Sequence, residues 1–144
     1  MEFIFVLIIV VIGYIVIKKL SESSKRNEQE ERRQKFAGQI GGKWVYDDDP
    51  KYFIEFVPDG FFGDFKTNNM PAIGGEVTGL YMINAPSFNY TVELVFRMVT
   101  HSGSSTSDDM PFRLNIHERD NGEYTLLLND RFDYRVFFQY TKKS

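Results

Sequence analysis

The amino-acid sequence predicts an all-β domain behind one transmembrane helix and a charged stalk. The domain is expected to be an antiparallel up-and-down meander of about eight strands that closes into a small barrel. An uncharged apolar run stands near the N-terminus, and from residue 43 onward apolar and polar residues alternate between turn-forming residues. No pattern for a crossover helix follows residue 43, so antiparallel pairing is favoured. A two-sheet sandwich fits the same period and is the structural alternative.

The charges are unevenly distributed along the 144 residues. Residues 18–35 carry seven Lys and Arg against four Glu, whereas residues 36–144 carry ten Lys and Arg against fifteen Asp and Glu. The globular part is therefore mildly acidic, which argues against nucleic acid as a partner. The chain has no cysteine, which excludes a disulfide scaffold and a thiolate metal site.

Residues 1–20 are predicted to form a transmembrane anchor. The run from Phe3 to Ile17 is uncharged and would be about 22 Å long as a helix, shorter than a hydrocarbon core of about 30 Å. Lys18 and Lys19 can extend to the interface and compensate. A cleaved signal peptide is the alternative, but the charge before the run is Glu2 and no Ala-x-Ala-like site follows it. All the flanking Lys and Arg follow the run, so the positive-inside rule places the later domain in the cytoplasm.

Residues 21–39 are predicted to form a charged juxtamembrane stalk. Glu28 with Arg32 and Glu31 with Lys35 have the i, i+4 spacing of a solvated helix. Docking of the basic residues on anionic lipid is the alternative, and the interspersed Glu residues argue against it.

The barrel domain is predicted over residues 40–144. Its first four strands are expected at 43–47, 51–57, 61–66 and 76–84. Pro58-Asp59-Gly60 is a turn signal between the second and third strands, and Gly63 is a candidate bulge. A loop is expected at residues 67–75.

The fifth strand, over residues 90–100, has the clearest alternation. One face would carry Tyr90, Val92, Leu94, Phe96 and Met98. A polar loop is expected at 101–109, and the last three strands at 111–118, 123–128 and 134–142. Asn121-Gly122 marks a hairpin turn before the seventh strand. One face of the eighth strand would carry Tyr134, Val136, Phe138 and Tyr140.

The first predicted strand begins with Gly42-Lys43-Trp44. This Gly-x-Trp, followed by "FVPDGFF", "GLYMI", "YTLLL" and "YRVFFQY", resembles the lipocalin superfamily, and bacterial lipocalin-like domains in particular, over about residues 40–142. The resemblance implies a calycin-type barrel. It also implies that Trp44 closes the base of the barrel with Arg135 of the last strand packed over its ring. The chain departs from the pattern because it has no lipobox cysteine and carries a basic flank before the domain.

The sequence offers no constellation for catalysis. His101 and His117 have no second histidine or cysteine at ligand spacing. The clusters 47–49 and 108–109 are expected to be solvated acidic turns rather than cation sites. Residues 102–107, "SGSSTS", lack the Gly-Lys and the helix of a phosphate-binding loop. We therefore expect no enzyme activity, no cofactor and no metal.

The aromatic residues expected inside the barrel are the candidate ligand-binding set, together with one isoleucine. They are Tyr52, Ile54, Phe56, Tyr90, Phe96, Phe112, Phe138 and Tyr140. A barrel of eight strands either fills its interior with side chains or holds one small ligand.

Two functions follow from this alternative. In the first, the domain binds a small apolar or amphipathic ligand near the bilayer. In the second, the barrel is filled and acts as a membrane-tethered interaction or scaffold domain, because apolar residues also lie on the other strand face, at Val95, Val99, Leu127 and Phe137. The expected partners are the bilayer, through residues 3–17, and either a hydrophobic ligand or a membrane protein.

Overall fold

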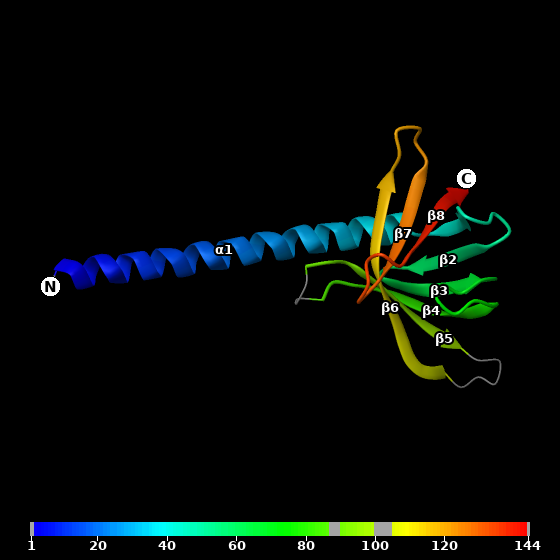
Figure 1. Cartoon of the computed structure of the whole chain (residues 1–144), viewed down its shortest axis with the longest axis horizontal. Helices are drawn as coiled ribbons and strands as arrows, with labels where there is room; N and C mark the ends of the chain where they lie inside the picture. Colours follow the sequence, from blue (N-terminus) through cyan, green and yellow to red (C-terminus); the bar gives the residue numbers. More distant parts are fainter. Residues whose placement is uncertain (1, 87–89, 100–104, 144) are drawn as a thin grey trace.

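The computed structural model describes residues 2–86, 90–99 and 105–143 and shows a long helix that runs into a β-barrel (Figure 1). Helix α1 spans Glu2–Gln39. The strands are β1 (Gly42–Tyr46), β2 (Phe53–Asp59), β3 (Phe62–Thr67), β4 (Val77–Asn84), β5 (Glu93–Val99), β6 (Ser105–Glu118), β7 (Tyr124–Asp130) and β8 (Phe137–Lys143). Each strand pairs antiparallel with the next, and β8 pairs with β1. The predicted closed meander is confirmed, and the sandwich alternative is wrong.

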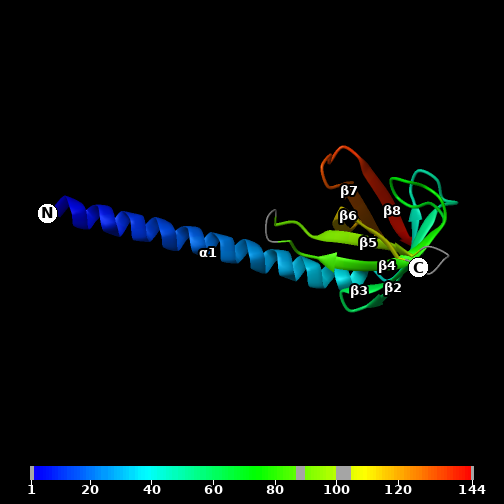
Figure 2. The same ribbon diagram turned by 90° about the horizontal axis from the view of Figure 1, so that it is seen from below.

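Helix α1 is unbroken, so the predicted anchor and stalk are two parts of one helix. Its 38 residues correspond to a length of about 57 Å. The large apolar side chains from Phe3 to Ile17 are exposed, and Figure 2 shows this part of the helix extending away from the barrel. By length and composition α1 is able to cross a bilayer. Gln29 and Phe36 are buried because the last third of the helix packs against the barrel.

Alternate residues of each strand point into the barrel, as the period-two pattern requires. Val92, Leu94 and Phe96 are buried, which confirms the inward face predicted for the fifth strand at these positions. On the outward face of β5, Glu93 is an exception to this pattern, because its side chain is buried and only 4 % exposed. Arg131, in the connection between β7 and β8, lies 3.6 Å from the Glu93 carboxylate and covers it.

Gly63 is required by close packing rather than by a bulge. It keeps regular pairing with both neighbouring strands, so the predicted bulge there is wrong. A Cβ at Gly63 would collide with the carbonyl oxygen of Val57 and with the ring of Tyr81. A register shift lies instead between Arg97 and Val99, where β5 pairs with β6.

Several strand boundaries differ from the prediction; β5, for example, begins at Glu93 rather than Tyr90. Strand β6 begins at Ser105, inside the segment expected to be a polar loop, because its ladder with β5 continues past Asp109. The outward guanidinium of Arg97 lies 3.0 Å from the Asp109 carboxylate, so polar residues are accommodated on this face. Strand β8 begins at Phe137 rather than Tyr134, because the preceding residues form a hydrogen-bonded turn.

Candidate functional site

Five of the eight candidate ligand-binding residues lie in the barrel core. Ile54, Phe56, Phe96, Phe112 and Tyr140 are each 3 % exposed or less. The ring centroids of Phe56 and Phe96 are 6.2 Å apart, and those of Phe96 and Phe112 are 5.8 Å apart. These rings contact one another across the centre of the barrel, which is the packing of an apolar core.

The other three candidates have different surroundings. Phe138 is half-buried, with its ring centroid 6.1 Å from that of Phe112. Tyr52 and Tyr90 belong neither to the core nor to the side chains packed on it, so their predicted interior position is wrong. Tyr90 precedes β5, has a φ of 51°, and lies beside α1 with the Lys25 ammonium 5.6 Å from its ring centroid.

Trp44 lies at the barrel end next to α1. Its side chain is fully buried, and its indole Nε1 donates a hydrogen bond of 2.7 Å to the carbonyl oxygen of Ile40. Phe36 and Ile40 of the helix end are buried against it. Gly42 has a φ of 108°, a conformation that glycine adopts without strain, and this lets the chain turn from the helix into β1.

The cation over the tryptophan is Lys142, and the prediction of Arg135 is wrong. The Lys142 ammonium lies 5.4 Å from the ring centroid of Trp44 and donates a 2.9 Å hydrogen bond to the carbonyl oxygen of Gln39. Lys142 pairs with Trp44 in the β1–β8 ladder. Arg135 precedes β8 and bonds to Asp133 at 3.0 Å, so the strand register places it away from the base.

Gln29 attaches the helix to the barrel. It is 3 % exposed although it carries a polar amide. Its Nε2 donates hydrogen bonds of 2.8 Å to the carbonyl oxygen of Pro86 and 2.6 Å to that of Thr91. Both acceptors belong to the connection between β4 and β5, so the buried amide joins the helix to this connection.

Two arginines extend this attachment. Arg33 Nε donates a 2.9 Å hydrogen bond to the carbonyl oxygen of Ile83, and its guanidinium lies 3.7 Å from the ring centroid of Phe61. Arg32 donates a 2.9 Å hydrogen bond to the carbonyl oxygen of Tyr90. We call Gln29, Arg32 and Arg33 the helix clamp. Because it joins charged and polar side chains to backbone carbonyls, it sets one orientation of the helix on the barrel.

The opposite end of the barrel is covered by the β3–β4 loop. Met70 of this loop is 1 % exposed and packs on the core. Ala72 has a φ of 73°, which is strained for a residue with a Cβ, and Gly74 N donates a 2.7 Å hydrogen bond to the Met70 carbonyl oxygen. A hollow of about 370 Å³ lies beside the loop, lined by loop residues and by Tyr46, Val136, Phe138 and Tyr140.

The outer face of β2–β5 also carries apolar residues around a hollow of about 450 Å³. Val57 is 59 % exposed, Leu80 49 % and Val99 40 %. The outward position predicted for Val99 is therefore confirmed. Phe137 is 56 % exposed on the outside of β8, whereas Val95 and Leu127 are half-buried.

Asp47 has a structural position that the sequence did not indicate. Its carboxylate accepts hydrogen bonds of 2.7 Å from Gln139 and 2.6 Å from Thr141, and Arg119 lies 3.3 Å away. The expectation of a purely solvated turn is wrong at this residue. Among the described residues, no three His, Asp or Glu side chains are grouped to hold a metal ion. His117 is exposed, and His101 lies outside the described residues.

Two interior tyrosines have raised pKa values. Burial, followed by the nearby Asp64 carboxylate, raises the pKa of Tyr81 to about 12. Burial, followed by Tyr46, raises the pKa of Tyr140 as well. Both hydroxyls therefore stay protonated at neutral pH. Within the described part of the chain, the buried Tyr81 hydroxyl has no hydrogen-bond partner.

The sequence interpretation missed Gln29, Arg33 and Met70. Gln29, Arg33, Phe36 and Ile40 follow one another at spacings of four, three and four residues, which places them on one helix face. This stripe is the signal that the stalk packs against the barrel. Its two polar members obscured it, and nothing in the loop sequence marked Met70 as a core residue.

No family model, curated protein or solved structure matches this chain. Its fold and contacts define a closed, eight-stranded antiparallel β-barrel with one end covered by its own N-terminal helix.

Proposed function

We propose that this protein is a membrane-anchored, lipocalin-like β-barrel that binds a protein partner through its outer surface, as a tethered interaction or scaffold module. The observation that carries this proposal is the filled interior. Aromatic rings contact one another through the barrel centre, Phe36 and Ile40 cover one end, and Met70 covers the other. A ligand inside would have to displace these side chains, so binding on the outside is favoured.

The membrane part of the proposal is supported by α1. Its exposed apolar side chains, followed by Lys18 and Lys19, are typical of a single span with an interfacial end. The Lys and Arg after the span favour a cytoplasmic barrel. The helix clamp fixes the orientation of the barrel relative to α1. The same face of the barrel is therefore held at the same height above the bilayer.

The outer face of β2–β5 supports a protein partner. Val57, Leu80 and Val99 form an apolar centre around the larger hollow. Charged pairs lie around it: Lys66 is 3.9 Å from Glu55, and Arg97 is 3.0 Å from Asp109. An apolar centre with a charged rim is the usual composition of a protein interface.

Site-specific photo-crosslinking in membranes tests this function. A photoreactive residue replacing Leu80 in the full chain is expected to give one discrete protein adduct. The same residue replacing Glu123, which is exposed on the β6–β7 turn, is the matched control and should give none. Native mass spectrometry of the full chain in detergent is expected to show the bare mass. A retained small molecule, with no adduct at Leu80, would overturn the proposal.

A second function is favoured by one observation, the hollow beside Met70. Its volume of about 370 Å³ and its lining by Tyr46, Phe138 and Tyr140 suit a small amphipathic molecule. Under this function, an environment-sensitive apolar dye binds the wild-type chain. Val136→Arg, at the exposed rim of the hollow, should abolish that binding without changing the fold. Dye binding that is unchanged by Val136→Arg would contradict this second function.

A further inference from the structure

The β7–β8 loop, residues 131–136, displays aromatic side chains to solvent. Phe132 is 92 % exposed and Tyr134 is 72 % exposed, and Phe137 directly after the loop is 56 % exposed. Burying such side chains is favourable, so a cluster left exposed indicates a binding surface.

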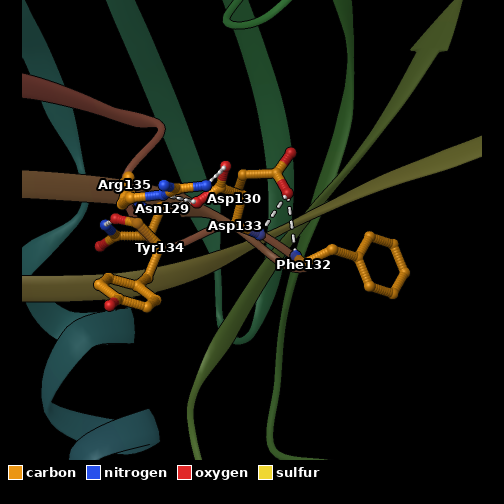
Figure 3. Close-up of polar contacts among 6 residues, drawn as sticks. All are labelled: Asn129, Asp130, Phe132, Asp133, Tyr134 and Arg135. Atoms are coloured by element: carbon orange, nitrogen blue, oxygen red, sulfur yellow. Dashed lines mark hydrogen bonds and ion pairs between the residues drawn. The ribbon is translucent and has the colours of Figure 1, made fainter.

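Hydrogen bonds hold this loop in one conformation (Figure 3). Asp130 Oδ1 accepts hydrogen bonds from the backbone amides of Phe132, at 2.9 Å, and Asp133, at 3.0 Å. Asn129 Nδ2 donates a 2.9 Å hydrogen bond to the Tyr134 carbonyl oxygen. The display of the two aromatic rings is therefore built before any binding, which reduces the entropy lost on contact.

The loop lies on the side of the barrel that faces the apolar half of α1. Arg131 is ion-paired with Glu93 at the start of β5, and Thr91, two residues earlier, accepts the hydrogen bond from Gln29 of the helix clamp. Figures 1 and 2, two views about the helix direction, both show the β7–β8 connection on the side of the barrel toward the N-terminus. A bilayer around α1 is therefore the nearest extended surface to this loop.

The height of the loop is compatible with membrane contact. Gln29 follows Lys19 by ten residues, which is about 15 Å along the helix. The headgroup layer accounts for about 5–8 Å of that distance. Transmembrane helices tilt by about 20° on average and by up to about 40°, and interfacial anchors select the tilt. A tilt toward β7–β8 brings the loop closer to the headgroups.

The charges of the loop indicate whether it would bind anionic or zwitterionic lipid. Arg135 bonds to Asp133 at 3.0 Å and Arg131 pairs with Glu93, so both cations are already neutralised within the barrel. The hydrogen bond from Arg135 lowers the pKa of the Asp133 carboxyl, which keeps this pair ionised. Contact through this loop therefore depends on the aromatic rings and needs no anionic lipid.

We infer that the β7–β8 loop inserts Phe132 and Tyr134 into the headgroup layer of the bilayer that holds α1, and so fixes the tilt of the helix. This inference rests on the proposed membrane anchoring. It adds a second, peripheral contact with zwitterionic lipid to the contact made by the span.

Single-cysteine labelling tests the inference, because the natural chain has no cysteine to interfere. The full chain is placed in phosphatidylcholine nanodiscs with an environment-sensitive dye on Tyr134→Cys. Ile73→Cys, on the β3–β4 loop and 58 % exposed, is the matched control, and Val10→Cys reports on the span. Lipids carrying a spin label near the headgroup are expected to quench the dye at 134 about threefold more than at 73.

A second variant distinguishes membrane contact by the loop from membrane contact by the attached dye. Phe132→Ser in the Tyr134→Cys background should return quenching to the level at residue 73, whereas Phe62→Ser, a comparable exposed phenylalanine on β3, should not. Added anionic lipid should leave the quenching unchanged. Equal quenching at 134 and 73, with a lipid-buried label at 10, would overturn the inference and leave the anchor intact. A water-exposed label at 10 would overturn the proposed anchoring itself.

Discussion

The two ends of the barrel are closed in different ways. At one end the chain itself continues into α1, Phe36 and Ile40 pack on Trp44, and polar side chains of the helix clamp bond to backbone carbonyls. At the other end Met70 is held over the core by a loop that contains the strained residue Ala72, and Pro71 of the same loop is also buried.

This difference separates a fixed end from an end that is able to open. Opening the α1 end requires several hydrogen bonds and a buried tryptophan to be lost together. Opening the opposite end requires only Met70 and Pro71 of one loop to leave the core, and Met70 is a flexible side chain. If a small molecule ever enters the barrel, we expect it to enter beside Met70, where the smaller hollow already lies.

Trp44→Ala is the largest test of the fixed end. The substitution removes a fully buried ring and its bond to the Ile40 carbonyl oxygen. We expect the free energy of unfolding to fall by about 3–5 kcal/mol. Denaturant unfolding of the full chain in micelles measures this, with Trp44→Phe, which keeps an aromatic ring, as the milder control. A fall below about 1 kcal/mol would mean that the α1 end is not part of the cooperative unit.

Met70→Ala tests the opening end. We expect a loss of about 2–3 kcal/mol, because a buried side chain is truncated and the loop relaxes only in part. The space vacated joins the hollow lined by Tyr46 and Phe138, so apolar dye binding should increase. Ile73→Ala in the same loop is exposed and should change neither quantity. Unchanged dye binding in Met70→Ala would show that the end stays closed without the methionine.

Gln29→Leu tests whether the clamp fixes orientation as well as stability. The hydrogen bonds from Gln29 to the carbonyl oxygens of Pro86 and Thr91 are lost, so we expect a loss of about 1–2 kcal/mol. Spin-label distances between α1 and the barrel should broaden, because the amide no longer holds the helix. Gln34→Leu, on the exposed side of the same helix, is the control. A sharp distance distribution in Gln29→Leu would assign the orientation to the apolar contacts alone.

The topology was predictable because local signals repeat along the chain. Alternation in segments such as Val92–Phe96, turns such as Pro58-Asp59-Gly60, and the lack of a crossover helix leave few arrangements other than a meander. Closure was predictable because eight strands bring the first and last edges together. These are properties of neighbouring residues, which a sequence shows directly.

The candidate site was less predictable because it depends on register and on distant contacts. Arg135 and Lys142 both lie near the C-terminus, and the position where β8 starts decides which one reaches Trp44. Gln29 reads as a solvated stalk residue until the carbonyls of Pro86 and Thr91 are placed beside it. Tyr90 fits the alternation of β5 but precedes the strand, with a positive φ.

Tyr81 tests the interior between the two ends, with the smallest expected effect. It is 2 % exposed, its hydroxyl has no partner among the described residues, and Gly63 makes room for its ring. Removing an unpaired buried hydroxyl should be favourable, so Tyr81→Phe is expected to raise the free energy of unfolding at pH 7 by about 1 kcal/mol.

The pH dependence of the free energy of unfolding provides a second test with the same variant. The pKa of Tyr81 is raised from 10.0 to about 12, so the protonated form is favoured in the folded state. Its contribution is fully present below pH 10 and is lost as the pH rises through about 12. Tyr81→Phe should therefore flatten the alkaline loss of stability, and Tyr140 should retain its share. If Tyr81→Phe instead destabilises the protein at pH 7, the hydroxyl has a partner inside the barrel. The interior then holds water or a small molecule, which would favour ligand binding over the filled module.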